Sequence, residues 1–135
     1  MPFVIDASVT LCWAFENEHE LAAEGALDRL NTDEAFVPSL WWYEIRNVLI
    51  VNERRGRKTE AKSSEFLSFL AGIPIWTDRS PDEAVVLALA RRHRLTVYDA
   101  AYLELARRRR EPLATLDRKL AAAAQAESVP LLGAP

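Results

Sequence analysis

Residues 3–8 read Phe3-Val4-Ile5-Asp6-Ala7-Ser8, an apolar run that stops at a carboxylate and continues into small and hydroxyl residues. An uninterrupted apolar run is typical of a central strand in an α/β sheet, because a strand covered on both faces loses the polar alternation. Asp6 then lies at the exit of this strand. Ligands bind at the carboxyl ends of parallel strands, so Asp6 is a candidate functional residue. It is also suited to cap the helix that begins near Ser8.

Short apolar runs alternate with segments of helical periodicity along the rest of the chain. We predict strands at residues 3–5, 35–37, 73–76, 113–115 and 129–132. We predict helices at residues 9–15, 19–30, 40–54, 59–70, 80–92, 98–110 and 117–126. This alternation predicts a parallel sheet with helices on both faces. Two local signals refine it: Pro74 favours an edge position for its strand, and Ser80-Pro81-Asp82-Glu83 has the pattern of a capping box.

Length and composition indicate one globular domain over residues 1–135, since half of the residues are hydrophobic and no linker interrupts the chain. The single cysteine, Cys12, excludes an intrachain disulfide and suits a reducing cytosol. Met1-Pro2 leads directly into the first strand, so we expect no signal peptide, and no segment is apolar enough to cross a bilayer. We therefore expect a cytoplasmic protein.

The basic residues are clumped, although the net charge of −3 argues against binding polyanions through overall charge. The clumps are Arg54, Arg55, Arg57 and Lys58; Arg91, Arg92 and Arg94; and Arg107 to Arg110. Such clumps are often solvated helix ends, and they can also contact phosphates. The sequence alone does not say which of them would do so.

Four carboxylates are candidates for one site. Asp6, Asp99 and Asp117 are each predicted near a helix start at the same edge of the sheet, whereas Glu44 lies inside the long helix among Trp41, Trp42 and Tyr43. A carboxylate in apolar surroundings requires a partner, because its desolvation is costly. Asn47, one turn further along the helix, can orient Glu44. The alternative is that Glu44 pairs with Arg46 or faces water.

Carboxylates gathered in one pocket repel one another and raise their own pKa values unless a cation lies among them. Ligand sets made only of oxygen atoms suit Mg²⁺ or Mn²⁺, and such an ion makes a bound water nucleophilic at neutral pH. Zinc fits poorly, because Cys12 and the scattered His19 and His93 form no ligand cluster. We expect both histidines to be surface residues on helices.

Four short motifs, in this order, resemble those of a known family. They are Asp6-Ala7-Ser8 after the first strand, Glu44-x-x-Asn47 in a tryptophan-rich helix, Tyr98-Asp99-Ala100-Ala101-Tyr102 at a helix start, and Thr115-Leu116-Asp117 with Leu120. The set is similar to the four acidic motifs of PIN-domain nucleases. The size and spacing are similar to those of the VapC-type ribonuclease toxins of bacterial toxin–antitoxin pairs, and the resemblance covers essentially the whole chain.

The resemblance implies a three-layer α/β/α sandwich with a central parallel sheet and a metal-dependent endoribonuclease. It implies that Asp6, Glu44, Asp99 and Asp117 form the catalytic and metal-binding cluster, with Asp6 and Asp99 as direct ligands of Mg²⁺ or Mn²⁺. Ser8, Asn47 and Thr115 would hold carboxylates or a metal-bound water in place. The resemblance implies that a metal-activated water attacks the phosphorus and that the 3′ oxygen departs, which gives a 5′-phosphate product.

The resemblance also implies three partners: an RNA substrate, a second copy of the chain in a homodimer, and a small cognate antitoxin in an apolar groove. The helix at residues 40–54 carries more apolar surface than one core contact requires, which is consistent with a partner. No membrane is expected among the partners.

Other functions remain open at this stage. A phosphatase of the haloacid dehalogenase type also places an aspartate after its first strand, but it needs a second aspartate where this chain has Ser8. An inactive PIN-like module that only binds RNA or protein would keep the fold without turnover. A housekeeping PIN nuclease would keep the chemistry without being a toxin.

Overall fold

The computed structural model describes residues 1–15 and 20–133, and within them a parallel sheet has the strand order β3-β2-β1-β4. The strands are β1 (Phe3–Ile5), β2 (Ala35–Pro38), β3 (Ile75–Asp78) and β4 (Leu113–Ala114). Phe3 pairs with Ala35 on one side of β1, and Val4 pairs with Leu113 on the other. All of β1 is buried, so the prediction of a central first strand is confirmed. Pro74 directly precedes β3, which is the edge strand as predicted.

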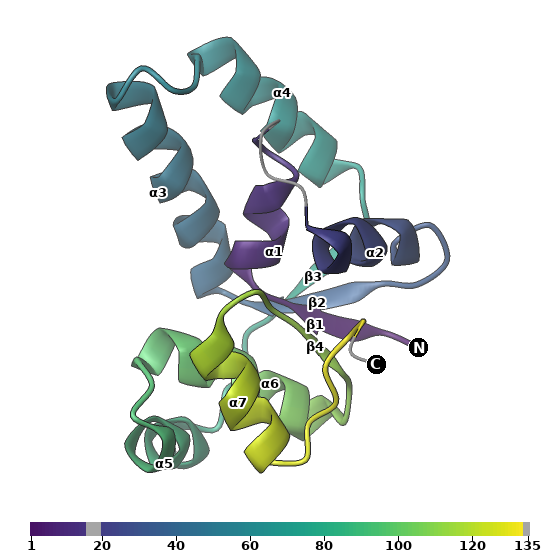
Figure 1. Cartoon of the computed structure of the whole chain (residues 1–135), viewed down its shortest axis with the longest axis vertical. Helices are drawn as coiled ribbons and strands as arrows, with labels where there is room; N and C mark the ends of the chain where they lie inside the picture. The colour runs from purple at the N-terminus through teal and green to yellow at the C-terminus, as the bar shows by residue number, and fades with distance from the viewer. Residues whose placement is uncertain (16–19, 134–135) are drawn as a thin grey trace.

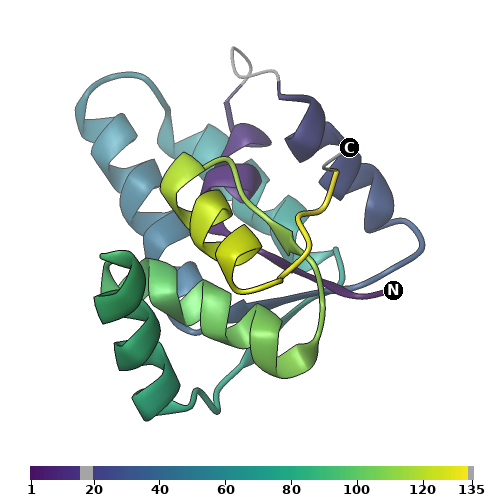
Figure 2. The ribbon, with the colours of Figure 1, turned by 60° about the horizontal axis from the view of Figure 1, so that its bottom comes forward.

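Helices cover both faces of this sheet (Figure 1). On one face are α1 (Ala7–Cys12), α2 (Leu21–Arg29), α3 (Leu40–Arg54) and α4 (Glu60–Ala71). On the other are α5 (Glu83–His93), α6 (Val97–Arg109) and α7 (Arg118–Ala126). Figure 2 shows the second group in front of the sheet and the first group behind it. The three-layer α/β/α sandwich is therefore confirmed. Among the described helices, none combines the length and apolarity that a membrane span requires.

Helix α6 is the central element of its layer. It packs against β1, β2 and β4 and lies between α5 and α7. Thr96 caps it by accepting the backbone N–H of Asp99 at 3.0 Å, and Arg110 ends it in a left-handed conformation with φ of 56°. Three arginines in the last turn oppose the partial negative charge of the helix C-terminus. The capped first turn thus fixes Asp99 at the end of α6 that faces the strand exits.

Three sequence predictions of secondary structure were wrong in detail. Residues 129–132 do not form a strand; Leu131 makes only an isolated bridge to Leu113. Asp82, not Ser80, caps α5, because its side chain accepts the Val85 N–H and the helix begins at the next residue. The first helix begins at Ala7, two residues earlier than predicted, because Asp6 caps its start. It ends at Cys12, before the predicted end at residue 15.

Other boundaries agree closely with the sequence predictions. The long helix α3 begins and ends as predicted, and Gly56 follows it with a φ of 71°, a backbone conformation that favours glycine. Thr59 caps α4 as predicted. The predicted helix at residues 19–30 is observed from Leu21, and its first residue, His19, lies outside the described residues.

A buried relay of hydrogen bonds joins α3 to the end of β1. The indole N–H of Trp41 donates to Thr10 Oγ1 at 3.0 Å, and Thr10 Oγ1 donates to the backbone carbonyl of Asp6 at 3.0 Å. Both side chains are inaccessible or nearly so. Because buried polar groups must be hydrogen-bonded, this relay fixes α3 relative to Asp6.

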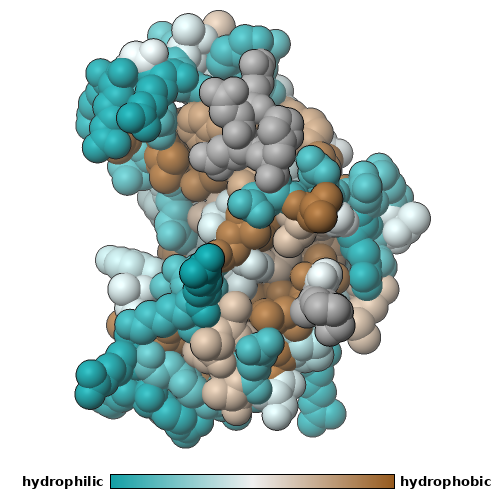
Figure 3. Space-filling view, viewed as in Figure 1, coloured by the Kyte–Doolittle hydropathy of each residue, from teal (hydrophilic) through white to brown (hydrophobic). Residues whose placement is uncertain are grey.

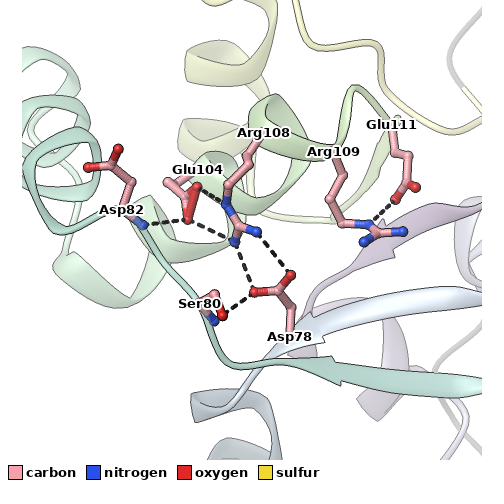
Figure 4. Close-up of polar contacts among 7 residues, drawn as sticks. All are labelled: Asp78, Ser80, Asp82, Glu104, Arg108, Arg109 and Glu111. Atoms are coloured by element: carbon pink, nitrogen blue, oxygen red, sulfur yellow. Dashed lines mark hydrogen bonds and ion pairs between the residues drawn. The ribbon is translucent and has the colours of Figure 1, made fainter.

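A second network fixes the end of β3 against α6 (Figure 4). Arg108 makes two hydrogen bonds to Asp78, at 2.9 and 3.0 Å, and two to Glu104, at 2.7 and 3.2 Å. Glu104 is only 1% exposed, and Arg108 compensates its charge. Arg108 also lowers the pKa of the Asp78 carboxyl below its ordinary value.

We expect Thr10→Val to lower the free energy of unfolding by about 1–3 kcal/mol, because the indole N–H of Trp41 is left buried without an acceptor. Urea denaturation measures this change. The matched control is Thr32→Val at an exposed threonine, for which we expect a change below about 0.5 kcal/mol. Equal effects of the two substitutions would contradict a structural role for the relay.

We expect Asp78→Asn to destabilise the protein at neutral pH but not in acid. Because Arg108 lowers the folded-state pKa of Asp78, the stabilisation is complete above 3.8, the ordinary pKa, and is lost as the pH falls further through the folded-state value. The difference in unfolding free energy between the two proteins should therefore shrink below that pH. Asp28→Asn at an exposed position is the control, and a difference that does not change with pH would contradict the prediction.

Candidate active site

The Asp6 carboxylate is both a helix cap and the centre of a hydrogen-bonded site. It is 5% exposed at the end of β1, and Oδ1 accepts the Val9 N–H at 3.1 Å, which caps α1. Ser8 donates to the same oxygen at 2.7 Å, and Thr115 donates to Oδ2. Ser8 in turn accepts the backbone N–H of Leu116 at 3.0 Å. The segments after β1 and β4 thus meet at this carboxylate.

Glu44 is held by a residue from the opposite layer. The hydroxyl of Tyr102, on α6, donates to Glu44 Oε1 at 2.6 Å. Burial and the neighbouring carboxylate raise the pKa of Tyr102, so the phenol keeps its proton and remains a donor. Arg46 stacks over the Trp42 ring at 3.9 Å instead of pairing with Glu44. Among the described residues, Asn47 is exposed and has no hydrogen bond to Glu44.

The remaining two acids sit at helix starts. Asp117 follows β4 as expected and caps α7 by accepting the Leu120 N–H at 2.8 Å. Asp99 lies in the first turn of α6 and follows the turn after α5. The predicted position of Asp99 at a helix start is confirmed, and Thr96 before it is the helix cap.

Burial and repulsion between carboxylates raise the pKa values of Asp6, Glu44 and Asp99. Burial raises the pKa of Asp6, and the charge of Asp99 raises it further. Hydrogen bonds from Ser8 and Thr115 act in the opposite direction. Burial, opposed by a hydrogen bond from Tyr102, raises the pKa of Glu44, and the charges of Asp6 and Asp99 raise it further. Burial and the charge of Asp117 raise the pKa of Asp99, and the charge of Lys119 opposes this rise. Asp99 thus repels Asp6, Glu44 and Asp117, and Asp6 also repels Glu44.

The donor chemistry of this cluster fits a magnesium-like ion. Within the described residues no group of three or more histidine, cysteine or acidic side chains is arranged to hold a metal. Mg²⁺, however, is commonly bound through one or two carboxylates and several waters. Asp6 accepts three hydrogen bonds, which leaves about one of its four acceptor positions free. His93 is engaged with Glu127 at 2.6 Å and Cys12 is buried in the core, so neither adds a zinc ligand.

Comparison with known proteins identifies the family. The family model of the PIN domain matches residues 3–126, a span that contains all four acids. The chain belongs to the PIN-domain family. It is 35% identical over 127 residues to Ribonuclease VapC3 from Pyrobaculum aerophilum, which covers 90% of this chain and 93% of that protein. This PIN domain also resembles the crystal structure of PAE2754 from Pyrobaculum aerophilum, with a TM-score of 0.70, 26% identity, and coverage of 91% of this chain and 87% of that one.

Sequence reasoning missed two residues that shape this PIN-domain site. Tyr102 belongs to a quoted motif, but its contact with Glu44 was not anticipated. Its spacing of three residues from Asp99 on one helix was the available signal, because such residues share a face. Thr10 is the other, and a hydroxyl five residues after the end of a strand carries no comparable signal.

We expect Tyr102→Phe to lower the free energy of unfolding by about 1–2 kcal/mol at neutral pH, because the half-buried Glu44 carboxylate loses its charge-assisted hydrogen bond. The measurement is urea denaturation in the presence of a chelator. Tyr43→Phe removes a hydroxyl from a side chain that is 69% exposed and should change little. Indistinguishable variants would show that the Tyr102 hydroxyl does not stabilise Glu44.

Proposed function

We propose that the chain is a divalent-metal-dependent endoribonuclease that hydrolyses RNA phosphodiesters as the toxin of a toxin–antitoxin pair. The observation that carries this proposal is that separate segments meet at the Asp6 carboxylate, where Thr115 donates to Asp6 and accepts the Asp117 N–H. The charge of Asp99 raises the pKa of Asp6 and of Glu44, and that of Asp117 raises the pKa of Asp99. A cluster of acids is unfavourable by itself, so its assembly favours a cation-binding role. The 35% identity to a protein named Ribonuclease VapC3 supports RNA as the substrate.

In this proposal Asp6 and Asp99 bind Mg²⁺ or Mn²⁺ directly, and Glu44 and Asp117 complete the cluster. When bound, the ion supplies positive charge for phosphate oxygens and lowers the pKa of water. Ser8 and Thr115 keep both oxygens of Asp6 oriented. These neutral donors hold the carboxylate without cancelling its charge, which leaves it available to a cation. Asn47 is exposed and lies one turn after Glu44 on α3, so in this proposal it borders the site without a hydrogen bond to Glu44 among the described residues.

The proposed partners are an RNA substrate, a small cognate antitoxin and a second copy of the chain. Exposed aromatic and aliphatic side chains on α3 support a protein partner: Trp42 is 50% exposed, and Ile50 is 44% exposed. A cytoplasmic location is proposed for the same function, in keeping with the single, buried Cys12.

We expect cleavage of structured RNA that requires Mn²⁺ or Mg²⁺, is abolished by chelator and falls by about 100-fold or more in Asp6→Asn and Asp99→Asn, because each loses a charged metal ligand. Gel analysis of labelled RNA measures the rate. Asp28→Asn changes an exposed aspartate on α2 in the same way and should leave the rate unaltered.

Cleavage that persists in chelator would contradict the metal-dependent mechanism. Absence of cleavage across a broad panel of RNAs would favour a PIN-like binding module. The toxin role has its own readout: induced expression should arrest growth, and Asp99→Asn should relieve the arrest. An active enzyme that leaves growth untouched would indicate a housekeeping nuclease.

A further inference from the structure

A cavity of about 1120 Å³ opens beside the acid cluster. Ser8 and Leu116 line it, and these residues are hydrogen-bonded to each other and, through Ser8, to Asp6. Arg55 and Arg57, in the turn after α3, line it as well. Figure 3 shows a notch at the left edge of the molecule between the α3 side and the α5 side, whereas the described lining of this cavity includes no residue of α5. The cavity therefore connects the proposed active site to a basic turn.

The structure distinguishes the three basic clumps by their ion pairs. In the clump at residues 107–110, Arg107 pairs with Glu127, Arg108 with Asp78 and Glu104, and Arg109 with Glu111. Arg109 also stacks over the Phe36 ring at 3.4 Å. Carboxylates of this chain thus already compensate most of this clump.

The other two clumps are less compensated. Arg92 pairs with Glu127 at 2.8 Å. Within residues 1–15 and 20–133, neither Arg55 nor Arg57 makes an ion pair, and both line the cavity. Lys58, next to them, donates to the carbonyl of Ala14 and lies over the Phe15 ring at 4.8 Å. Because Arg55 and Arg57 have no acidic partner among the described residues, their guanidinium groups are available to bind phosphate oxygens.

The rest of the lining suits an unpaired base. Leu11, Phe15 and Leu116 contribute apolar surface, and an aromatic ring can stack on a base of any identity. Among the lining residues that the structure describes, the two arginines outnumber the one acid, Glu20, which is exposed. Among its described lining residues the cavity thus presents both positive charge and apolar surface, which match the phosphate and the base of a single-stranded nucleotide.

We propose that Arg55 and Arg57 bind backbone phosphates of a single-stranded RNA segment that passes from the acid cluster into this cavity, with its bases against Phe15 and Leu11. This inference rests on the proposed ribonuclease function and assigns the path of its substrate. Phosphate contacts give affinity and register but little sequence preference. The two arginines are binding residues and take no part in the chemistry.

We expect Arg55→Gln/Arg57→Gln to weaken binding of a labelled single-stranded RNA of mixed sequence by about tenfold. The slope of log affinity against log salt should fall by about 0.7 for each lost phosphate contact. Fluorescence anisotropy in excess chelator measures both, and a gel checks that the RNA stays intact. In cleavage assays with metal, KM should rise while kcat changes little.

The matched control is Arg110→Gln, compared with each single variant. Arg110 is exposed, has no ion pair among the described residues and ends α6, a helix of 13 residues that spans ~20 Å from the turn holding Asp99. The Arg110→Gln substitution removes one positive charge far from the cavity, so its RNA affinity should stay near that of the unsubstituted chain.

Unchanged affinity and salt slope in the double variant, with cleavage intact, would overturn the RNA path and leave the ribonuclease proposal standing. If the double variant binds RNA normally and loses affinity only for a protein partner, the RNA path would be overturned as well, because the cavity would then bind a protein segment. No RNA binding by the unsubstituted chain would refute both proposals. Equal losses of RNA affinity in each single variant and in Arg110→Gln would indicate an effect of overall charge, which also contradicts a specific path.

Discussion

The desolvated carboxylate of Asp6 is the constraint on which the structure around the site depends. A charge that is almost completely buried must be hydrogen-bonded, and each of its donors comes from a segment that this requirement fixes in place. Hydrogen bonds from Ser8 and Val9 fix the start of α1, and the one from Thr115 fixes the segment after β4. The backbone carbonyl of Asp6 accepts a further hydrogen bond from the Thr10 hydroxyl. Satisfying one aspartate thus organises the edge of the sheet where the other acids gather.

The protein stabilises buried acids in two different ways. Glu104 and Asp78 share the guanidinium of Arg108, so a cation of the fold itself offsets part of their negative charge. Asp6 and Glu44 receive neutral hydroxyl donors instead, and their pKa values are raised. A guanidinium removes an electrostatic cost, whereas a hydroxyl only orients a carboxylate. The first arrangement suits a structural joint, and the second suits a site whose counter-charge comes from outside.

How much the sequence could predict depended on the range of each interaction. Local signals were sufficient for β1, for the bounds of α3 and for caps such as Thr59, because these depend on neighbouring residues. The Tyr102–Glu44 hydrogen bond joins residues 58 positions apart in opposite layers, and no periodicity reports such a contact. The arginine clumps could not be ranked for the same reason, since the acids that neutralise them come from distant elements.

The distribution of the site along the chain has a consequence for synthesis. Asp6 and Glu44 belong to the first third of the polypeptide, but the groups that complete their surroundings, from Asp99 to Asp117, are translated much later. Proteins emerge from the ribosome amino terminus first. A half-made chain therefore cannot assemble the four acids. In the proposed ribonuclease, RNA cleavage would therefore begin only after the carboxyl-terminal third of the chain has been released and packed.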